Sequence, residues 1–334
     1  MANDITRQVL YFVGPKQVEL RTETIAPPKA DQILIRTELS AISHGTERLI
    51  YEGQVPTDMP LDETLPDLAG TFQYPFKYGY ALVGRVEQVG SAVSSRWLNR
   101  LVFAFHPHEN HFVTTPEQVL PIPEEVSAED ALFLPNMETA VNLVLDGQPL
   151  MGERVAVFGQ GVVGLLTTAL LSDFPLAELT AVEPTAHRST LALDWADAYE
   201  AAEPEEIENS RTKYDLVYEL SGQPSALNLA VNCARFGGRI VVGSWYGNKP
   251  VTLDLGSRFH RQRLQIMSSQ VSTLSPHLSG RWSKERRLNW AWLMVEEHEP
   301  SDLISHRFSI EEAVKAYKAL RKFKATAVQI VLTY

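Results

Sequence analysis

A glycine-rich turn in the middle of the chain constrains the fold more than any other feature of the sequence. Gly159, Gly161 and Gly164 form the pattern G-x-G-x-x-G between an apolar run at residues 155–158 and an apolar stretch at 162–172. The first run has the length of a buried strand and the second that of a helix. A strand, a tight glycine turn and a helix in this order predict a phosphate-binding turn for a dinucleotide.

Each part of the turn has a physical role in that interpretation. The first glycine allows the tight turn, the second lets the backbone approach a pyrophosphate, and the third lets the helix pack on the sheet. The N–H groups of Val162 and Val163, in the first helical turn, would then point at the phosphates. The alternative is an ordinary glycine-containing turn in an α/β core.

An acidic residue at the end of the next expected strand supports the dinucleotide interpretation. Glu183 lies 19 residues beyond Gly164, close to the usual spacing. Its carboxylate can accept hydrogen bonds from ribose hydroxyls and would repel a 2′-phosphate, which favours NAD over NADP. Arg188 could partly reverse this preference, so NADP stays open, and Glu183 could also be a solvated strand-end acid.

The stretch from about residue 127 to 271 alternates expected strands and helices, which predicts a parallel, doubly wound α/β sheet. The carboxyl ends of such strands line the cofactor crevice. Further cofactor-binding residues are therefore expected where the later strands end, although tight turns without a ligand would look the same. They are Ser221, Gly222, Gly243, Ser244 and Ser269.

The N-terminal part has a different hydrophobic pattern. It contains expected strands and no amphipathic run of helix length before about residue 127. The expected strands are 9–13, 17–22, 32–43, 80–89, 101–105 and 112–115. Two helices, near 288–297 and 310–320, and a strand at 327–332 end the chain. We predict a β-rich domain at 1–137, completed by 272–334, and a dinucleotide-binding domain at 138–271.

Composition excludes several partners and chemistries. The 334 residues carry a net charge of −11, which argues against nucleic acid or an anionic membrane as the main partner. The lone Cys233 excludes internal disulfides and any multi-cysteine zinc site. The first residues lack the apolar core of a signal peptide. A cytoplasmic enzyme with a small-molecule substrate is the expectation.

The order of the motifs resembles the medium-chain dehydrogenase/reductase superfamily over nearly the whole chain. Its markers here are residues 43–47 (SHGTE), 78–90, the glycine turn, 237–243 and 303–310. The resemblance implies a GroES-like β-rich catalytic domain plus a Rossmann domain, with the active site in the cleft between them. It also implies a homo-oligomer, expected as a homodimer paired through the strand near residues 264–270.

The departures from zinc-containing members are informative. Where those members carry Cys, a Gly-His-Glu sequence, and Cys or Glu as ligands, this chain has His44, Tyr80 followed by Ala81, and Pro135. Two of these three positions cannot ligate zinc, and one histidine does not hold it alone. We therefore predict a member without zinc, in which hydrogen-bonding side chains polarise the substrate.

The resemblance also suggests which side chains carry the chemistry. Thr46 aligns with the hydroxyl residue that relays the alcohol proton, and Thr139 with a residue beside the nicotinamide. His44 titrates in the range needed for acid/base work, and Tyr80 can donate to a carbonyl oxygen. Each side chain could instead be structural, His44 as a hydrogen-bonded turn residue and Tyr80 as packing.

Three further clusters have open interpretations. His106, His108 and His111 suggest a metal, but a solvated or pocket-lining loop fits better because no other ligand completes a site. The aromatic segment 72–80 could hold a flat or apolar substrate or pack a long loop. The basic run 281–287 could meet an acidic substrate tail or begin a solvated helix.

The favoured function is hydride transfer between NAD(P)(H) and a secondary alcohol/ketone pair, with a large flat or apolar substrate possible. Residues 39–56 resemble bacteriochlorophyllide dehydrogenases, which oxidise a hydroxyethyl group on a tetrapyrrole ring. Two alternatives remain, an NADPH-dependent quinone or enone reductase and a nucleotide-binding sensor without catalysis.

Overall fold

The computed structural model describes residues 4–62, 65, 68–200, 213–323 and 326–334. The chain divides into two compact units, one of residues 1–135 with 295–334 and one of residues 136–294. The first unit is therefore built from both ends of the chain. Among the described helices, none is long and apolar enough to cross a membrane.

The first unit is built mainly from antiparallel strands. Its strands are β1 (Ile5–Gly14), β2 (Gln17–Ile25), β3 (Ile33–Ile42), β4 (Phe76–Lys77), β5 (Leu82–Val89), β6 (Leu101–Ala104), β7 (His111–Thr114), β8 (Leu120–Pro121), β15 (Ile304–Ser309) and β16 (Gln329–Thr333). Its helices are α1 (Thr46–Tyr51), α2 (Ala128–Ala131) and α9 (Ala313–Lys322). Within the described residues, one sheet has the order β2-β1-β4 and a larger one the order β15-β16-β3-β5-β6-β8, with β7 also on β3.

The core of the larger sheet follows from the alternation of its strands. Apolar side chains of β3, β5, β6 and β7 meet in one buried cluster, which includes Ile33, Leu82, Val102 and Phe112. The C-terminal strand β16 pairs with β3, which closes the first unit with the end of the chain. The short helix α1 was not expected, because six residues are too few to reveal a helical period.

The second unit contains the strands and helices of a doubly wound domain. Its strands are β9 (Arg154–Phe158), β10 (Glu178–Val182), β11 (Ala198–Glu200), β12 (Tyr214–Glu219), β13 (Ala234–Val242) and β14 (Gln265–Ser268). Its helices are α4 (Val162–Ser172), α5 (Ala186–Ala192) and α7 (Pro224–Cys233). Helices α3 (Leu134–Gly147) and α8 (Lys284–His298) cross the boundaries between the units.

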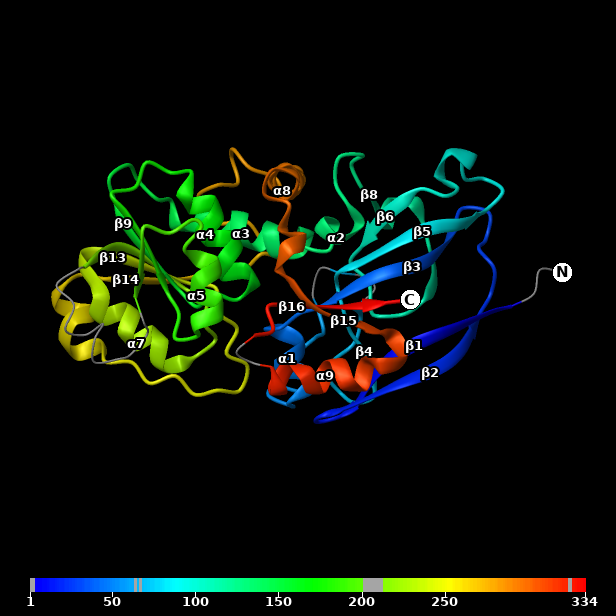
Figure 1. Cartoon of the computed structure of the whole chain (residues 1–334), viewed down its shortest axis with the longest axis horizontal. Helices are drawn as coiled ribbons and strands as arrows, with labels where there is room; N and C mark the ends of the chain where they lie inside the picture. The colour runs from blue at the N-terminus through cyan, green and yellow to red at the C-terminus, as the bar shows by residue number, and fades with distance from the viewer. Residues whose placement is uncertain (1–3, 63–64, 66–67, 201–212, 324–325) are drawn as a thin grey trace. The chain divides into compact units, whose positions relative to one another are not determined.

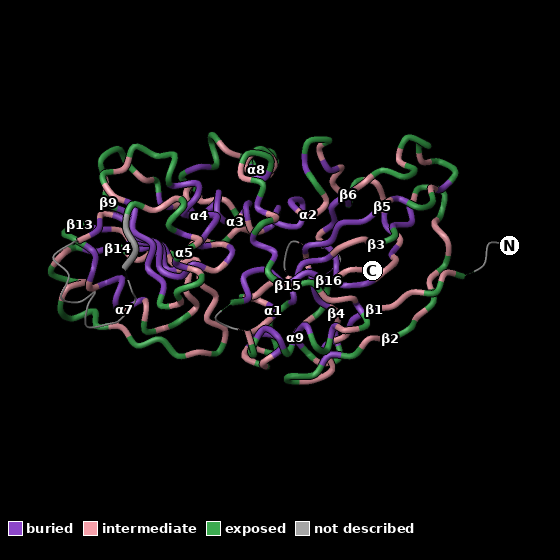
Figure 2. The backbone as a smooth tube through the Cα atoms, viewed as in Figure 1, coloured by how far each residue is buried: buried purple, intermediate pink, exposed green. Residues whose placement is uncertain are grey.

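The described part of this sheet has the order β11-β10-β9-β12-β13-β14, and every neighbouring pair is parallel (Figure 1). The order reverses between β9 and β12, which is the topological switch point of a Rossmann sheet. Side chains of α7 pack on one face of the sheet, and Leu143 of α3 and Leu171 of α4 pack on the other. The central strands are buried almost throughout (Figure 2). The predicted fold class is confirmed.

The second domain boundary differs from the predicted one. Residues 272–294 cluster with the second unit, whereas we expected the return to the first domain at 272. The physical reason is Arg287, which is 2% exposed and is held by side chains of α3. Its guanidinium donates to Glu138 Oε1 at 2.9 Å and to Asn142 Oδ1 at 2.5 Å.

Candidate active site

The glycine turn has the geometry that its sequence predicts. Gly159 follows β9 with φ +91°, and a Cβ there would lie 2.5 Å from the Ser221 Cα. A Cβ on Gly164 would lie 1.9 Å from the Gly159 carbonyl oxygen, so the helix packs directly on the turn. Gly161 is different, because a Cβ there would meet nothing within 4 Å. The turn is thus crowded toward the sheet and open at its middle glycine.

The N-terminus of α4 is available for an anion. Gly161 is its N-cap, and no side chain caps it within the described structure. The first N–H groups of a helix lack intrahelical acceptors, and here they belong to Val162 and Val163. Free N–H groups beside an open glycine suit a phosphate.

Five residues that directly follow the strands stand in one line across the sheet. They are Gly159, Glu183, Leu220, Gly243 and Ser269, and we call them the strand-end row. The preceding residues, from Phe158 to Ser268, are in register from β10 to β14. Backbone hydrogen bonds of 2.8–3.1 Å join neighbouring strands at the row. The predicted cofactor residues of these five, all but Leu220, therefore lie along one edge of the sheet.

Glu183 is 5% exposed and fastens the glycine turn. Its Oε2 accepts from the Gln160 N–H at 2.9 Å, and its Oε1 accepts from the Thr185 N–H at 3.0 Å. The alternative of a solvated strand-end acid is wrong, because the side chain is buried. Arg188 lies half-buried on α5, close along the chain.

The loops after β12 and β13 are joined by side chains around a fully buried carboxylate. Glu219 accepts from the Tyr246 hydroxyl at 2.5 Å and from the Ser221 N–H at 2.9 Å. The Gly222 N–H donates to the Ser244 hydroxyl at 2.8 Å. The structure thus brings Ser221, Gly222 and Ser244 together. Our sequence reasoning missed Glu219, although an acid that ends an apolar strand was a usable signal.

Ser269 and Thr139 complete the predicted cofactor residues. The Ser269 hydroxyl donates to Asp146 Oδ2 at 2.7 Å and accepts from Asn142 Nδ2 at 3.0 Å. Both partners lie on α3, one and two turns after the half-buried Thr139. The residue after β14 is therefore fixed to α3 of the same unit.

The predicted catalytic residues lie in the first unit. The structure joins two of them, Thr46 and Tyr80, through Ser43, which was not among the predicted residues. The Tyr80 hydroxyl donates to the Ser43 Oγ at 2.6 Å, and the Thr46 N–H donates to the same oxygen at 3.3 Å. We call Ser43, Thr46 and Tyr80 the hydroxyl cluster. Burial raises the pKa of the Tyr80 hydroxyl, and this effect exceeds the lowering by its hydrogen bonds with the Ser43 and Thr46 side chains. His44 lies half-buried in the same loop.

A buried carboxylate supports the loop that carries this cluster. Glu47 is fully buried, and its Oε1 accepts from the Ser43 N–H at 2.8 Å. Its Oε2 lies 3.0 Å from His108 Nε2 and also accepts from the Tyr317 hydroxyl. Burial and the neighbouring Glu47 carboxylate raise the pKa of Tyr317 well above its usual range. Glu47 therefore ties the loop to two other segments of the first unit.

Comparisons with known proteins find relatives in sequence and in fold. The chain is 26% identical over 277 residues to a 2-desacetyl-2-hydroxyethyl bacteriochlorophyllide A dehydrogenase of Cereibacter sphaeroides, covering 76% of this chain and 78% of that enzyme. It is 26% identical over 222 residues to an L-threonine 3-dehydrogenase of Bacillus subtilis, of which it spans 59%. An Escherichia coli alcohol dehydrogenase structure with NADH shares the fold at a TM-score of 0.78 and 18% identity, over 98% of this chain and 99% of that one. No family model matches the chain.

The curated relatives and the structural neighbours are dehydrogenases of the medium-chain type, and this chain is similar to them over most of its length. The resemblance noted from its motifs is confirmed, and the chain is an NAD(P)-dependent oxidoreductase. The roles assigned above to individual residues stay predictions.

The superfamily's zinc positions hold unusual residues here. His44 is the one metal-binding side chain among them, the Tyr80 hydroxyl is engaged with Ser43, and Pro135 has no donor atom. In the described parts of both units, no group of three His, Cys, Asp or Glu side chains could hold a metal ion. The lone Cys233 is buried in the core of the Rossmann unit.

The three rings of the histidine cluster are paired with carboxylates, and two of them are buried. Each ring faces a different carboxylate: His106 lies 2.6 Å from Glu109, and His111 lies 3.3 Å from Glu87. His108 is fully buried and contacts Glu47, as described above. The expectation of a solvated loop is wrong for His106 and His108, which are buried. Glu109 lies three residues from His106, whereas Glu47 and Glu87 come from segments that the local sequence does not bring together.

The two other sequence clusters are the aromatic segment 72–80 and the basic run 281–287. Phe72, Phe76 and Tyr78 are 2–7% exposed, and the rings contact one another at 5.7–6.0 Å. These three rings thus pack among themselves, and Phe76 also stacks on Phe12 of β1. The basic run begins the helix α8, and residues 283–286 are exposed, as expected for a solvated helix start. Its last residue, Arg287, departs from this expectation because it is buried.

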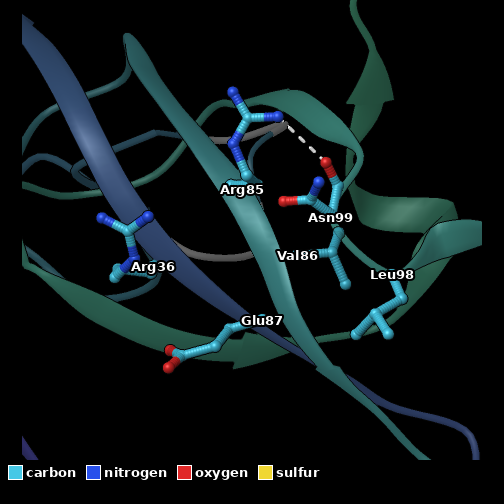
Figure 3. A pocket seen from close by; sticks show the side chains of 6 residues that line it. All are labelled: Arg36, Arg85, Val86, Glu87, Leu98 and Asn99. Carbon is cyan, nitrogen blue, oxygen red and sulfur yellow. Dashed lines mark hydrogen bonds between the residues drawn. The ribbon is translucent and has the colours of Figure 1, made fainter.

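A surface groove in the first unit lies away from all predicted site residues. Figure 3 shows its lining, with Arg36 and Arg85 on neighbouring strands. Arg85 donates to Glu38 at 2.9 Å and to the Asn99 carbonyl oxygen at 2.9 Å. Arg36 lies 3.8 Å from the same Glu38 carboxylate. Since both arginines are near Glu38 and Glu87 adds a negative charge, the groove offers no strong anion site.

Proposed function

We propose that this chain is a zinc-independent oxidoreductase that prefers NAD(H) and interconverts a secondary alcohol and a ketone. The observation that carries the proposal is the hydroxyl cluster, in which Tyr80, at one of the three zinc positions, donates a hydrogen bond to Ser43. The net reaction takes an alcohol and NAD⁺ to a ketone, NADH and a proton. When bound, the nicotinamide accepts or supplies the hydride.

The Rossmann unit supports a nicotinamide dinucleotide as the cofactor. The crowding around Gly159 and Gly164, with open space at Gly161, is what a pyrophosphate-binding turn requires. Val162 and Val163 would hold the phosphates through their N–H groups. Glu183 would accept the adenosine ribose hydroxyls, and its charge would disfavour a 2′-phosphate. Ser221, Gly222, Gly243, Ser244, Ser269 and Thr139 would line the remaining cofactor site.

The first unit supports catalysis without zinc. A carbonyl oxygen gains negative charge as it is reduced, and fixed donors stabilise that charge. Tyr80 is protonated at neutral pH, as an ordinary tyrosine is, and burial raises the pKa of its hydroxyl further. His44 is the candidate acid and base in the same loop. A catalytic zinc needs about three protein ligands, and the set of His44, Tyr80 and Pro135 does not fit one.

The substrate and the assembly are also part of this proposal. The Cereibacter sphaeroides relative is named for a hydroxyethyl group on a bacteriochlorophyllide, which favours a secondary alcohol carried on a large flat ring. Phe72, Phe76 and Tyr78 of the aromatic segment do not add support, since they are buried. A homodimer paired through β14 is proposed because β14 forms the edge of the described sheet.

Cofactor titration with a substrate panel tests the function. The purified chain is titrated with NADH and NADPH by fluorescence and assayed on secondary alcohols, ketones, quinones and a hydroxyethyl tetrapyrrole. We expect tighter NADH binding and turnover of an alcohol/ketone pair. Tighter NADPH binding with quinone turnover would favour a quinone reductase, and NADH binding without any turnover would indicate a sensor.

A further inference from the structure

We propose that Ser43 donates the hydrogen bond to the substrate oxygen and that Tyr80 is the positioning residue behind it. This inference rests on the proposed function and deepens it, because it names the group that replaces zinc. It also revises the expectation that Tyr80 contacts the substrate directly. The argument comes from the hydrogen bonds of one loop in the first unit.

The hydrogen-bond inventory of Ser43 leaves one proton unused. A serine hydroxyl accepts two hydrogen bonds and donates one. The Ser43 Oγ accepts from the Tyr80 hydroxyl at 2.6 Å and from the Thr46 N–H at 3.3 Å. Both acceptor sites are filled, and no acceptor for the Ser43 proton occurs among the described residues. Ser43 is half-buried, so this proton is available to a ligand.

Tyr80 has the opposite inventory, because its proton is already used. Its hydroxyl donates to Ser43, and the Thr46 side chain also hydrogen-bonds it. The raised pKa of this hydroxyl keeps it a donor across the neutral range. A donor that receives a hydrogen bond itself becomes a stronger donor. Tyr80 therefore strengthens the Ser43 hydroxyl and fixes its direction.

The backbone at Ser43 is held as firmly as its side chain. Its N–H donates to the buried Glu47 carboxylate at 2.8 Å, and Glu47 is fixed in turn by His108 and Tyr317. The residue follows β3, whose last residue, Ile42, is fully buried and paired with Ile330. A donor held in this way needs little reorganisation when negative charge develops.

The chemical role is hydrogen bonding without proton loss from Ser43. As the hydride reaches the carbonyl carbon, the C=O π bond breaks and the electron pair moves to oxygen. The Ser43 hydroxyl stabilises this oxyanion and keeps its O–H bond. Protonation of the oxyanion, for which His44 is the candidate acid, completes the alcohol, so the sum is ketone, hydride and proton to alcohol.

A double-mutant cycle tests the order of the two hydroxyls. We expect S43A to lower kcat by about 100-fold, the effect of losing one oxyanion donor. Y80F should lower kcat by about tenfold with KM unchanged, because Ser43 remains but loses its partner. The double variant should match S43A, since removing the donor makes its support irrelevant. S43T should restore most of the activity.

Controls separate this inference from the proposed function. Ser305 lies in the same unit, donates to the Gln329 carbonyl at 2.9 Å and accepts from the Val328 N–H at 3.0 Å, so S305A should leave kcat unchanged. NADH affinity should stay within about twofold in every variant, since the predicted cofactor residues lie in the other unit. Should S43A fail to fold, S43T and Y80F carry the test.

Several outcomes would overturn the assignment. A larger loss in Y80F than in S43A would make Tyr80 the direct donor, and additive losses would make the two hydroxyls independent. Full activity in S43A beside an active wild type would refute the role of Ser43 and leave the proposed function standing. A wild type without turnover on the panel would refute both.

Discussion

The strand-end row of the Rossmann unit and the hydroxyl cluster of the first unit are built in different ways. The row is aligned by backbone hydrogen bonds between parallel strands, so any sequence that forms the sheet places it. The cluster depends on side chains, with Tyr80 reaching Ser43 from 37 positions along the chain. A backbone-built site tolerates most side chains but few changes at its glycines, whereas a side-chain-built site depends on each hydroxyl and carboxylate.

The largest effect is expected at the first glycine of the turn. In Gly159→Ala the positive φ costs about 1–3 kcal/mol, and a Cβ 2.5 Å from the Ser221 backbone adds a clash. We expect a total loss of at least about 3 kcal/mol and no measurable NADH binding. Urea unfolding and fluorescence titration measure these effects.

The matched control is Gly161→Ala, where the Cβ meets open space and φ is −74°. Its stability should change by less than about 0.5 kcal/mol, while NADH binding weakens about tenfold because the backbone approaches the pyrophosphate less closely. Equal stability losses in the two variants would break the distinction between the crowded and the open glycine.

The next effect concerns the support of the hydroxyl cluster. In Glu47→Gln an NH₂ group replaces one carboxylate oxygen. In the wild type both oxygens accept hydrogen bonds, from the Ser43 N–H and the Tyr317 hydroxyl, so one of these donors loses its acceptor. Leaving a buried donor unsatisfied costs about 1–3 kcal/mol, and we expect a loss in that range. Turnover should fall while NADH affinity holds, as shown by urea unfolding and the same titration. A loss of NADH affinity instead would contradict a role confined to the first unit.

Cofactor selectivity should change at Glu183 by a smaller amount. Glu183→Gln removes the charge but keeps one acceptor oxygen for the glycine turn. We expect the preference for NADH over NADPH to shrink about tenfold, which equals about 1.4 kcal/mol. The ratio of the two dissociation constants measures it. An unchanged ratio would show that Glu183 only stabilises the glycine turn through its hydrogen bond from the Gln160 N–H.

The smallest effect is a pH dependence in the first unit. Burial and the hydrogen bond to Glu23 raise the pKa of Tyr11 to about 12 from a usual value of 10.0. Because the folded-state pKa is the higher one, this stabilisation is complete below pH 10 and disappears as the pH rises to about 12. Unfolding free energies from pH 9 to 12 should fall less steeply in Tyr11→Phe. Parallel curves for the two proteins would refute the assignment.

The two regions also differ in how far the sequence could predict them. The glycine turn, Glu183 and the strand ends are local patterns, and parallel pairing then aligns them without further information. The partners of Tyr80, His108 and Arg287 lie on distant segments. The motif at residues 43–47 marked the loop that carries Ser43 and Glu47, but no pattern showed which side chains these residues or Glu138 would meet. Helix α1 was missed because it is shorter than two helical turns.

The central claim is hydride transfer supported by hydroxyl groups in place of zinc. The most direct test measures metal content and turnover on the same chelator-dialysed sample of the wild-type chain. We predict full turnover of an alcohol/ketone pair with far less than one zinc per chain, and no gain on adding zinc. Loss of turnover on dialysis, with recovery in proportion to the zinc that is bound, would contradict the account.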